Sequence, residues 1–411
     1  MKEYDLITLP NGIRVVHKEV THTKIAHCGI MLDIGSRDEG VDQQGMAHFW
    51  EHMAFKGTKK RKAFHIINRL ESLGGELNAY TTKEKICFYA TVLDNHFDKS
   101  VELLTDITFN SVFPEKQIDK EKSVILEEMS MYKDSPEDAI QDEMDELVFA
   151  NHQLGNNILG NVESVKSFKK SDFERFLHEN IDTSKIVFSC VGNVPLKKVI
   201  KIAGKYLGQV PTIENKKARL PVNGYRPALK TERKEILQAH CAIGKRSFHL
   251  FENERIPFFV LNNVLGGQSM NSRLNLSLRE NYGLVYSIES SYQPYTDTGM
   301  FSIFYGTEPD SLEKSIELTF KEIKKLQQKA LGSSQLQTAK NQIKGQLAMS
   351  EENYNSIMLM MAKSLLDMGK IQSLDSVFEK IDKITGAQLQ DLAIKSLQRD
   401  EMSILTYVPK E

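Results

Sequence analysis

No apolar run in this chain of 411 residues approaches the roughly 20 consecutive residues that a membrane-spanning helix needs. The N-terminal residues MKEYDL also lack the apolar core of a secretory signal and the arginine-rich, acid-poor composition of an organelle presequence. These absences predict a protein with no membrane partner and favour a cytoplasmic location.

Cysteine is scarce, and neither sign of charge is in large excess. The four cysteines are scattered among strand-like apolar residues, without the spacing of a metal site, and are Cys28, Cys87, Cys190 and Cys241. We expect them to be reduced and buried rather than paired in disulfides. A formal net charge of −2 gives no reason to expect nucleic acid as a partner. With 40% hydrophobic and 26% charged residues, the composition is that of a globular protein.

The most informative stretch reads HFWEH and covers residues 48–52. Apolar neighbours on both sides predict a buried helix that ends at Gly57, because glycine is the usual C-terminal breaker. His48 and His52 are four residues apart, so a helix projects both imidazoles from one face, at the spacing that one metal ion requires. Glu51 lies beside them as a candidate base. Two histidine ligands, an open coordination position and an adjacent carboxylate are the parts of a hydrolytic zinc site, here in the inverse order of the commoner zinc-protease signature.

Two histidines on a helix are more often surface or core residues than ligands, so the motif needs a third ligand. A helix predicted over residues 119–132 offers one. Its positions at i, i+3, i+4 and i+7 form one stripe and are Glu121, Val124, Ile125 and Glu128. By themselves Glu121 and Glu128 would be solvated charges on a mixed face. Beside the histidines, Glu128 becomes a candidate oxygen ligand and Glu121 a carboxylate that orients a ligand.

The chain also divides into two similar halves. A proline-containing stretch between Gly208 and Pro227 separates them. Near its end each half carries a helix-like stretch followed by an apolar strand, at 173–177 and 185–191 in the first half and at 389–397 and 402–408 in the second. Such an echo suggests a duplicated α+β domain.

Together these features resemble the M16 metallopeptidases, the group of pitrilysin, insulysin and the mitochondrial processing peptidase. The distance from His52 to Glu128 matches the spacing of that family, and Glu121 matches its second glutamate. Further segments that resemble the family are 9–12, 35–39, 73–81, 272–280 and 283–287. Trp50 is a departure, since many relatives carry a smaller apolar residue there, and it should alter packing beneath the helix rather than the chemistry.

The resemblance implies an α+β fold of two homologous domains, each a mostly antiparallel sheet packed with helices. We expect a zinc-binding catalytic domain over 1–210, a linker over 211–227 and a C-terminal domain over 228–411. The implied cofactor is one Zn²⁺ per subunit, held by His48, His52 and Glu128, although cobalt or manganese could occupy such a site. Glu51 would be the base of an amide hydrolysis, with Glu121 in support.

An edge strand is the expected peptide dock. Leu77, Asn78, Ala79 and Tyr80 match the active-site edge strand of the family, and their alternation into residues 86–90 predicts a hairpin that turns at 81–85. An extended peptide substrate could add to that edge through main-chain hydrogen bonds. Taken alone, Asn78 would be a plain turn residue.

Arg279 and Tyr286 would, taken alone, be surface and core residues, with Arg279 near a helix end and Tyr286 on the following strand. The resemblance implies instead that they reach the substrate backbone and help to stabilise the oxyanion. Long relatives fuse four such domains, whereas this chain has two. A homodimeric clamshell is therefore expected, in which Arg279 and Tyr286 of one subunit complete the zinc site of the other.

The main alternative is a non-catalytic assembly or scaffold subunit, because the family includes members that have lost zinc. Retention of His48, Glu51, His52 and Glu128 argues against it. A metallohydrolase that acts on something other than peptides is the second alternative, and no phosphate-binding loop or similar motif supports it.

Overall fold

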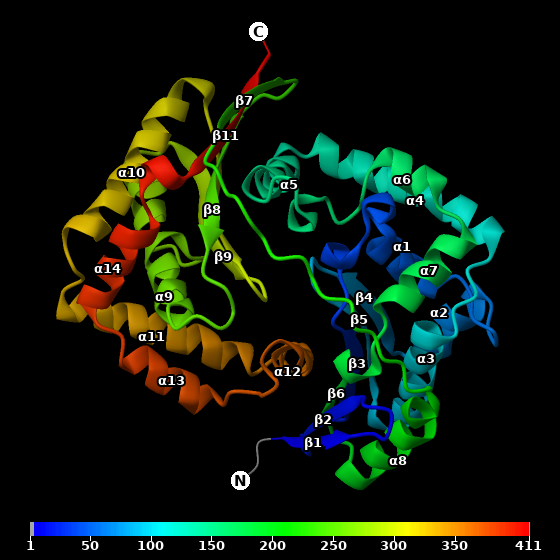
Figure 1. The fold of residues 1–411 in the computed structure, drawn as a ribbon. Helices are drawn as coiled ribbons and strands as arrows, with labels where there is room; N and C mark the ends of the chain where they lie inside the picture. Colours follow the sequence, from blue (N-terminus) through cyan, green and yellow to red (C-terminus); the bar gives the residue numbers. More distant parts are fainter. Residues whose placement is uncertain (1–3, 411) are drawn as a thin grey trace. The chain divides into compact units, whose positions relative to one another are not determined.

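A computed structural model of the chain describes residues 4–410, which form two compact units (Figure 1). The first unit contains residues 4–129, 156–220 and 349–371, and the second contains 130–155, 221–348 and 372–410. Each unit therefore includes one segment from the other half of the sequence.

The first unit is built on a six-stranded sheet in the order β1-β2-β6-β3-β5-β4. The β2–β6 pair is parallel and the other four pairs are antiparallel. This order makes β4 an edge strand. The strands are β1 (Asp5–Thr8), β2 (Arg14–Glu19), β3 (Ile25–Leu32), β4 (Glu76–Thr81), β5 (Ile86–Leu93) and β6 (Ile186–Gly192).

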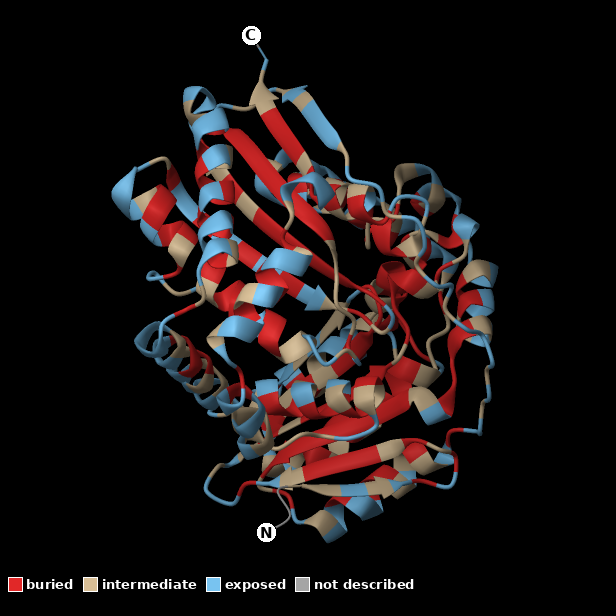
Figure 2. Cartoon of the chain, turned by 60° about the vertical axis from the view of Figure 1, so that its left-hand side comes forward, coloured by how far each residue is buried: buried red, intermediate tan, exposed pale blue. Residues whose placement is uncertain are grey.

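Both faces of this sheet are covered, which explains why the central strand β6 is buried along its whole length and its neighbour β3 along most of its length (Figure 2). One face forms the main apolar core with helices from the first half of the sequence. These helices are α1 (Met46–Ala54), α2 (Ala63–Glu71), α3 (Phe97–Phe109), α4 (Glu115–Asp134), α6 (Val162–Ser167), α7 (Lys170–Asn180) and α8 (Leu196–Tyr206). The other face packs against α12 (Tyr354–Met368), whose buried Met358 and Met361 cluster with Met31 and Val187 of the sheet.

The second unit has a five-stranded sheet in the order β7-β11-β8-β10-β9. Only the β7–β11 pair is parallel. The strands are β7 (Leu229–Lys234), β8 (Ala239–Ser247), β9 (Val285–Pro294), β10 (Gly299–Thr307) and β11 (Ser403–Pro409). One face packs on α5 (Pro136–Val148), with Met144 and Ile140 buried against it. The other carries α9 (Arg255–Gly266), α10 (Leu312–Gln328), α11 (Ser333–Ser350), α13 (Leu374–Asp382) and α14 (Gly386–Ser396).

The predicted fold class is confirmed, because each unit is a mostly antiparallel sheet packed with helices. The predicted hairpin is present as β4 and β5, and the four cysteines are free and buried. Residues 210–228 form no helix or strand. None of the described helices is both long and apolar enough to cross a membrane.

Two local predictions were wrong. The helix that carries the histidines ends at Ala54 rather than at Gly57, because Phe55 and Lys56 already close tighter turns onto His52 and Met53. On α4, Val124 is 49% exposed. The buried stripe of that helix is Ile118, Glu121, Ile125 and Met129.

Candidate metal centre

Helix α1 is held at its start by a buried carboxylate. Glu39 accepts hydrogen bonds from the backbone N–H groups of Gly45, at 2.9 Å, and Ala47, at 2.8 Å. A carboxylate at this position satisfies the free N–H groups of a helix N-terminus and complements the helix dipole. Burial raises the pKa of Glu39, and the two backbone donors oppose that rise. The orientation of α1, and with it of His48 and His52, is thus anchored by a residue that the sequence analysis missed.

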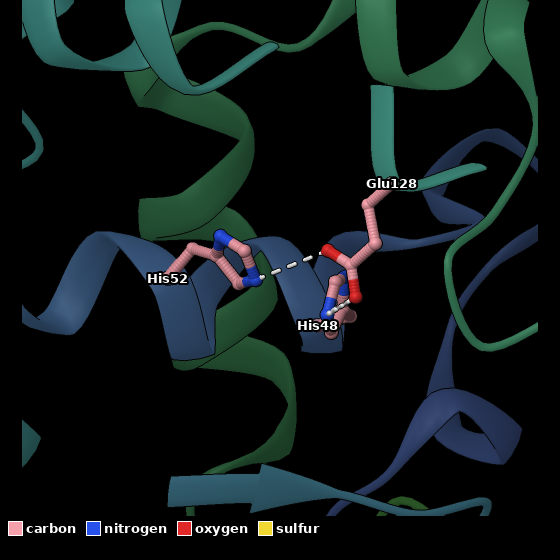
Figure 3. Close-up of side chains that lie close together, drawn as sticks. All are labelled: His48, His52 and Glu128. Carbon is pink, nitrogen blue, oxygen red and sulfur yellow. Dashed lines mark ion pairs between the residues drawn. The ribbon is translucent and has the colours of Figure 1, made fainter. Parts of the chain in front are cut away.

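The structure brings His48, His52 and Glu128 together (Figure 3). Nε2 of His48 lies 3.8 Å from Oε1 of Glu128, and Nε2 of His52 lies 3.6 Å from Oε2. One ligand atom of each residue lies within 4.8 Å of the other two. These separations are too long for hydrogen bonds. Ligands held at zinc–ligand distances in a tetrahedral site are about 3.3 Å apart, so the three residues fit around one such ion with small adjustments.

The state of the imidazoles also fits a metal. Burial, reinforced by the charge of His52, lowers the pKa of His48 to about 3, so this ring is neutral and has a lone pair to donate. Nδ1 of His52 lies 2.9 Å from Oε1 of Glu121. In the tautomer that is protonated at Nδ1, this nitrogen donates a hydrogen bond to Glu121, and the Nε2 lone pair of His52 is left facing Glu128.

Glu121 has a second partner that the sequence analysis missed. Its side chain is buried, and its Oε2 lies 2.7 Å from Nζ of Lys56. Burial acts to raise the pKa of Glu121, but the hydrogen bonds from His52 and Lys56 outweigh it and lower the pKa. Glu121 is therefore an ionised acceptor for His52. A lysine four residues after His52 was the only sequence signal for this contact.

Glu51 is held by the edge strand. The hydroxyl of Thr81, the last residue of β4, donates a hydrogen bond of 2.6 Å to Oε2 of Glu51. Burial raises the pKa of Glu51, while this hydrogen bond opposes the rise. A carboxylate with a raised pKa and a fixed orientation suits a proton acceptor. The sequence analysis placed Thr81 in the hairpin without assigning it a contact.

The four residues of the expected peptide dock all lie on β4. Leu77 and Ala79 pack against the main core, on the side of the sheet that α1 covers. Tyr80 faces the opposite side, where its ring lies 6.2 Å from that of Tyr89. Asn78 pairs with Tyr89 across the ladder. Among the described strands β4 pairs only with β5, so its other edge is unpaired.

Arg279 and Tyr286 lie in the second unit, and the three clustered residues lie in the first. Arg279 is near the end of a short π-helix (Asn275–Asn281), and Tyr286 follows on β9. The guanidinium lies 5.6 Å from the ring centre of Tyr286, which is 86% exposed. The expected positions on a helix end and on the following strand are confirmed.

Trp50 is a residue of α1, and its side chain is completely buried. Its ring centre lies 5.5 Å from that of Phe88 and 6.5 Å from that of Phe176. Trp50 therefore packs in the core, on the other side of α1 from the ligand face.

Comparison with known proteins shows the family to which this chain belongs. The model of the Insulinase (Peptidase family M16) family matches residues 14–162, and that of the Peptidase M16 inactive domain matches residues 167–343. The chain belongs to peptidase family M16. An uncharacterized zinc protease of Bacillus subtilis, YmxG, is 34% identical over 96% of this chain and 95% of its own length. A similarly named zinc protease of Mycobacterium leprae is 30% identical over 95% of this chain and 89% of its own.

Solved structures share the M16 fold. A protease from Helicobacter pylori matches with a TM-score of 0.90 and 20% identity, over 99% of both chains. A peptidase M16 inactive domain from Pseudomonas fluorescens matches with a TM-score of 0.91 and 17% identity, over 99% of this chain and 98% of its own. At these identities the likeness concerns the fold alone.

Proposed function

We propose that this M16 protein is a zinc-dependent endopeptidase that hydrolyses extended or unfolded peptides. One observation carries the proposal. His48, His52 and Glu128 converge at ligand distances, with Glu51 on the same helix and fixed by the open edge strand. A scaffold subunit has no use for two imidazoles and a carboxylate that converge in this way, and the buried Nδ1 of His48 has no hydrogen-bond partner among the described residues.

His48, His52 and Glu128 would hold the metal. When bound, zinc lowers the pKa of a water ligand from 15.7 to roughly 7 and polarises a carbonyl oxygen. Glu51 takes the proton of the attacking water and later delivers it to the leaving amine. Thr81 keeps one oxygen of Glu51 occupied, so that the other is directed to the water. Glu121 fixes His52 by accepting a hydrogen bond from its Nδ1–H group.

The substrate would bind as an extra strand on β4. Main-chain hydrogen bonds along Leu77, Asn78, Ala79 and Tyr80 would select extended peptides of many sequences. Because Thr81 of this strand contacts Glu51, a peptide aligned on β4 runs close to the base. A folded substrate presents no free strand for such pairing, and this is the reason for the preference.

The first test is cleavage of a panel of quenched peptides, with and without a chelator, by the parent protein and by Glu51→Gln. We expect chelator-sensitive cleavage that Glu51→Gln loses by at least about 1,000-fold while it retains zinc. Glu127→Gln is the matched control, because Glu127 lies exposed on α4, one position from Glu128. This variant should cleave the peptides like the parent protein. No bound metal would favour the scaffold alternative, whereas bound zinc without any cleavage would point to a missing partner subunit or a narrow substrate.

We also propose a homodimer in which Arg279 and Tyr286 of one subunit complete the zinc site of the other. The presence of both residue sets in one two-domain chain supports it. Mixing Glu51→Gln with Arg279→Ala should then restore activity above either parent variant, since one mixed site contains neither substitution. If the subunits exchange and no activity appears, the shared site is wrong.

A further inference from the structure

The two imidazoles of the candidate centre are held differently. Nδ1 of His48 is buried and has no hydrogen-bond partner among the described residues. Nδ1 of His52 has Glu121 at 2.9 Å. His52 is thus the imidazole whose ring orientation and tautomer are set by a carboxylate. A neutral imidazole has one N–H and one lone pair, so whichever group accepts the N–H decides which nitrogen can bind a metal.

Glu121 is in turn held by a single cation. Its side chain is 5% exposed, and Nζ of Lys56 contacts the oxygen that His52 does not use, at 2.7 Å. The two oxygens therefore have different partners, and rotation of the carboxylate would break both contacts. Without Lys56, Glu121 would be a buried carboxylate with one oxygen unsatisfied, an arrangement that favours movement of the side chain toward solvent.

Lys56 can contact Glu121 although it lies outside the helix that carries the histidines. It follows the end of α1 at Ala54, and its backbone N–H closes a turn onto Met53. Its side chain is 30% exposed, so the ammonium reaches a buried carboxylate from the surface.

We propose that Lys56 is a positioning residue of the metal site, which holds Glu121 in the orientation that directs the Nε2 lone pair of His52 at the metal. The inference rests on the proposed zinc function and adds to it a residue that contacts neither the metal nor the substrate. Its effect reaches zinc through two contacts in series, from Lys56 to Glu121 and from Glu121 to His52.

The test is zinc affinity, measured on the full chain by competition with a chromogenic chelator. Lys56→Met keeps the length of the side chain and removes the charge, and should weaken zinc binding roughly 10-fold, as is typical when the partner of a ligand is lost. Lys60→Met is the matched control, because Lys60 is exposed and its side chain has no contact that the structure records. It should bind zinc within about 2-fold of the parent. Lys56→Arg should recover most of the loss.

A double-mutant cycle separates positioning from general damage. In a Glu121→Gln background the further change Lys56→Met should have little effect on zinc affinity, because the two residues act through one contact. Additive losses in the double variant would overturn the proposal, as would Lys56→Met binding zinc like the parent. If Lys56→Met does not fold, Lys56→Gln takes its place in the same cycle. A parent protein that binds no zinc would instead sink the proposed function itself.

Discussion

At the scale of single residues, the carboxylates around α1 are distinguished by their donors. Glu39 accepts hydrogen bonds from backbone N–H groups, and Glu51 accepts one from the hydroxyl of Thr81. Glu121 has His52 and Lys56 as its hydrogen-bonding partners. Glu128 instead faces two imidazole nitrogens at 3.6 and 3.8 Å, beyond hydrogen-bond length. Glutamate thus serves here as a helix cap and as the proposed base, orienting group and metal ligand, and the neighbouring donor distinguishes these roles.

Replacing Thr81 tests the base directly. Thr81→Val keeps the shape of the side chain on a strand and removes the donor to Glu51. A hydrogen bond to a charged group contributes about 1.5–3 kcal/mol, so kcat should fall roughly 10- to 100-fold. KM should change little, because the backbone of β4 is unaltered, and zinc content should stay at the parent level.

Thr108→Val is the control for the change at Thr81. The hydroxyl of Thr108 is buried but donates only to Leu104 of its own helix. Steady-state kinetics of both variants with one quenched peptide measure the difference. Equal kcat in Thr81→Val and the parent would show that Glu51 does not depend on this hydrogen bond.

At the scale of elements, α1 begins at a point where two backbone segments touch. Gly45 precedes the helix with φ +92°, and a Cβ there would lie 2.5 Å from the carbonyl oxygen of Leu159. Gly160 approaches from the other side, where a Cβ would lie 2.3 Å from the carbonyl oxygen of Gln44. The histidine-bearing helix is therefore fixed by a close approach that only glycine permits.

Gly45→Ala should displace the start of α1. The left-handed conformation and the clash with Leu159 together should destabilise the fold by roughly 2–5 kcal/mol and weaken zinc binding. Gly74→Ala is the control, since Gly74 also has a positive φ, of +73°, but a Cβ there meets nothing within 4 Å. It should cost only about 1–2 kcal/mol and leave zinc binding unchanged. Denaturant unfolding and chelator competition measure both; equal losses in the two variants would contradict the role of the close approach.

At the scale of the whole molecule, each half of the sequence contributes one helix to the unit that is built mainly from the other half. The sheet of the first unit is covered on one face by α12, from the second half of the sequence, and α5 of the first half packs on the sheet of the second unit. The proposed domains 1–210 and 228–411 differ from the compact units by these two helices. A cut in residues 210–228 would leave each half without one layer.

A fragment of residues 1–220 should therefore fail to unfold cooperatively, because Met31 and Val187 would lose the cover of Met358 and Met361. Joining residues 349–371 to that fragment through a flexible linker should restore a cooperative transition. Chemical denaturation followed by circular dichroism, with dye binding to exposed apolar surface, distinguishes the two. Cooperative unfolding of 1–220 alone would show that α12 is dispensable.

Local pattern was sufficient for much of the candidate site. The helix of His48 and His52, the helix of Glu121 and Glu128, and the hairpin of β4 and β5 were all predicted, because helical and strand periodicities act over a few residues. Val124 was misplaced because the apolar stripe was read as wider than the face that α4 buries.

The sequence by itself determined the family, and the resemblance to that family implied the fold class and the candidate ligand Glu128. The spacing of His48 and His52 on one helix followed from residue type and local periodicity alone. Only the tertiary structure decided which groups hold those residues. Thr81 reaches Glu51 and Lys56 reaches Glu121 across 30 and 65 positions of chain, and α12 reaches the sheet from the other half. Contacts of this kind depend on how sheets and helices pack, and no periodicity within one segment encodes them.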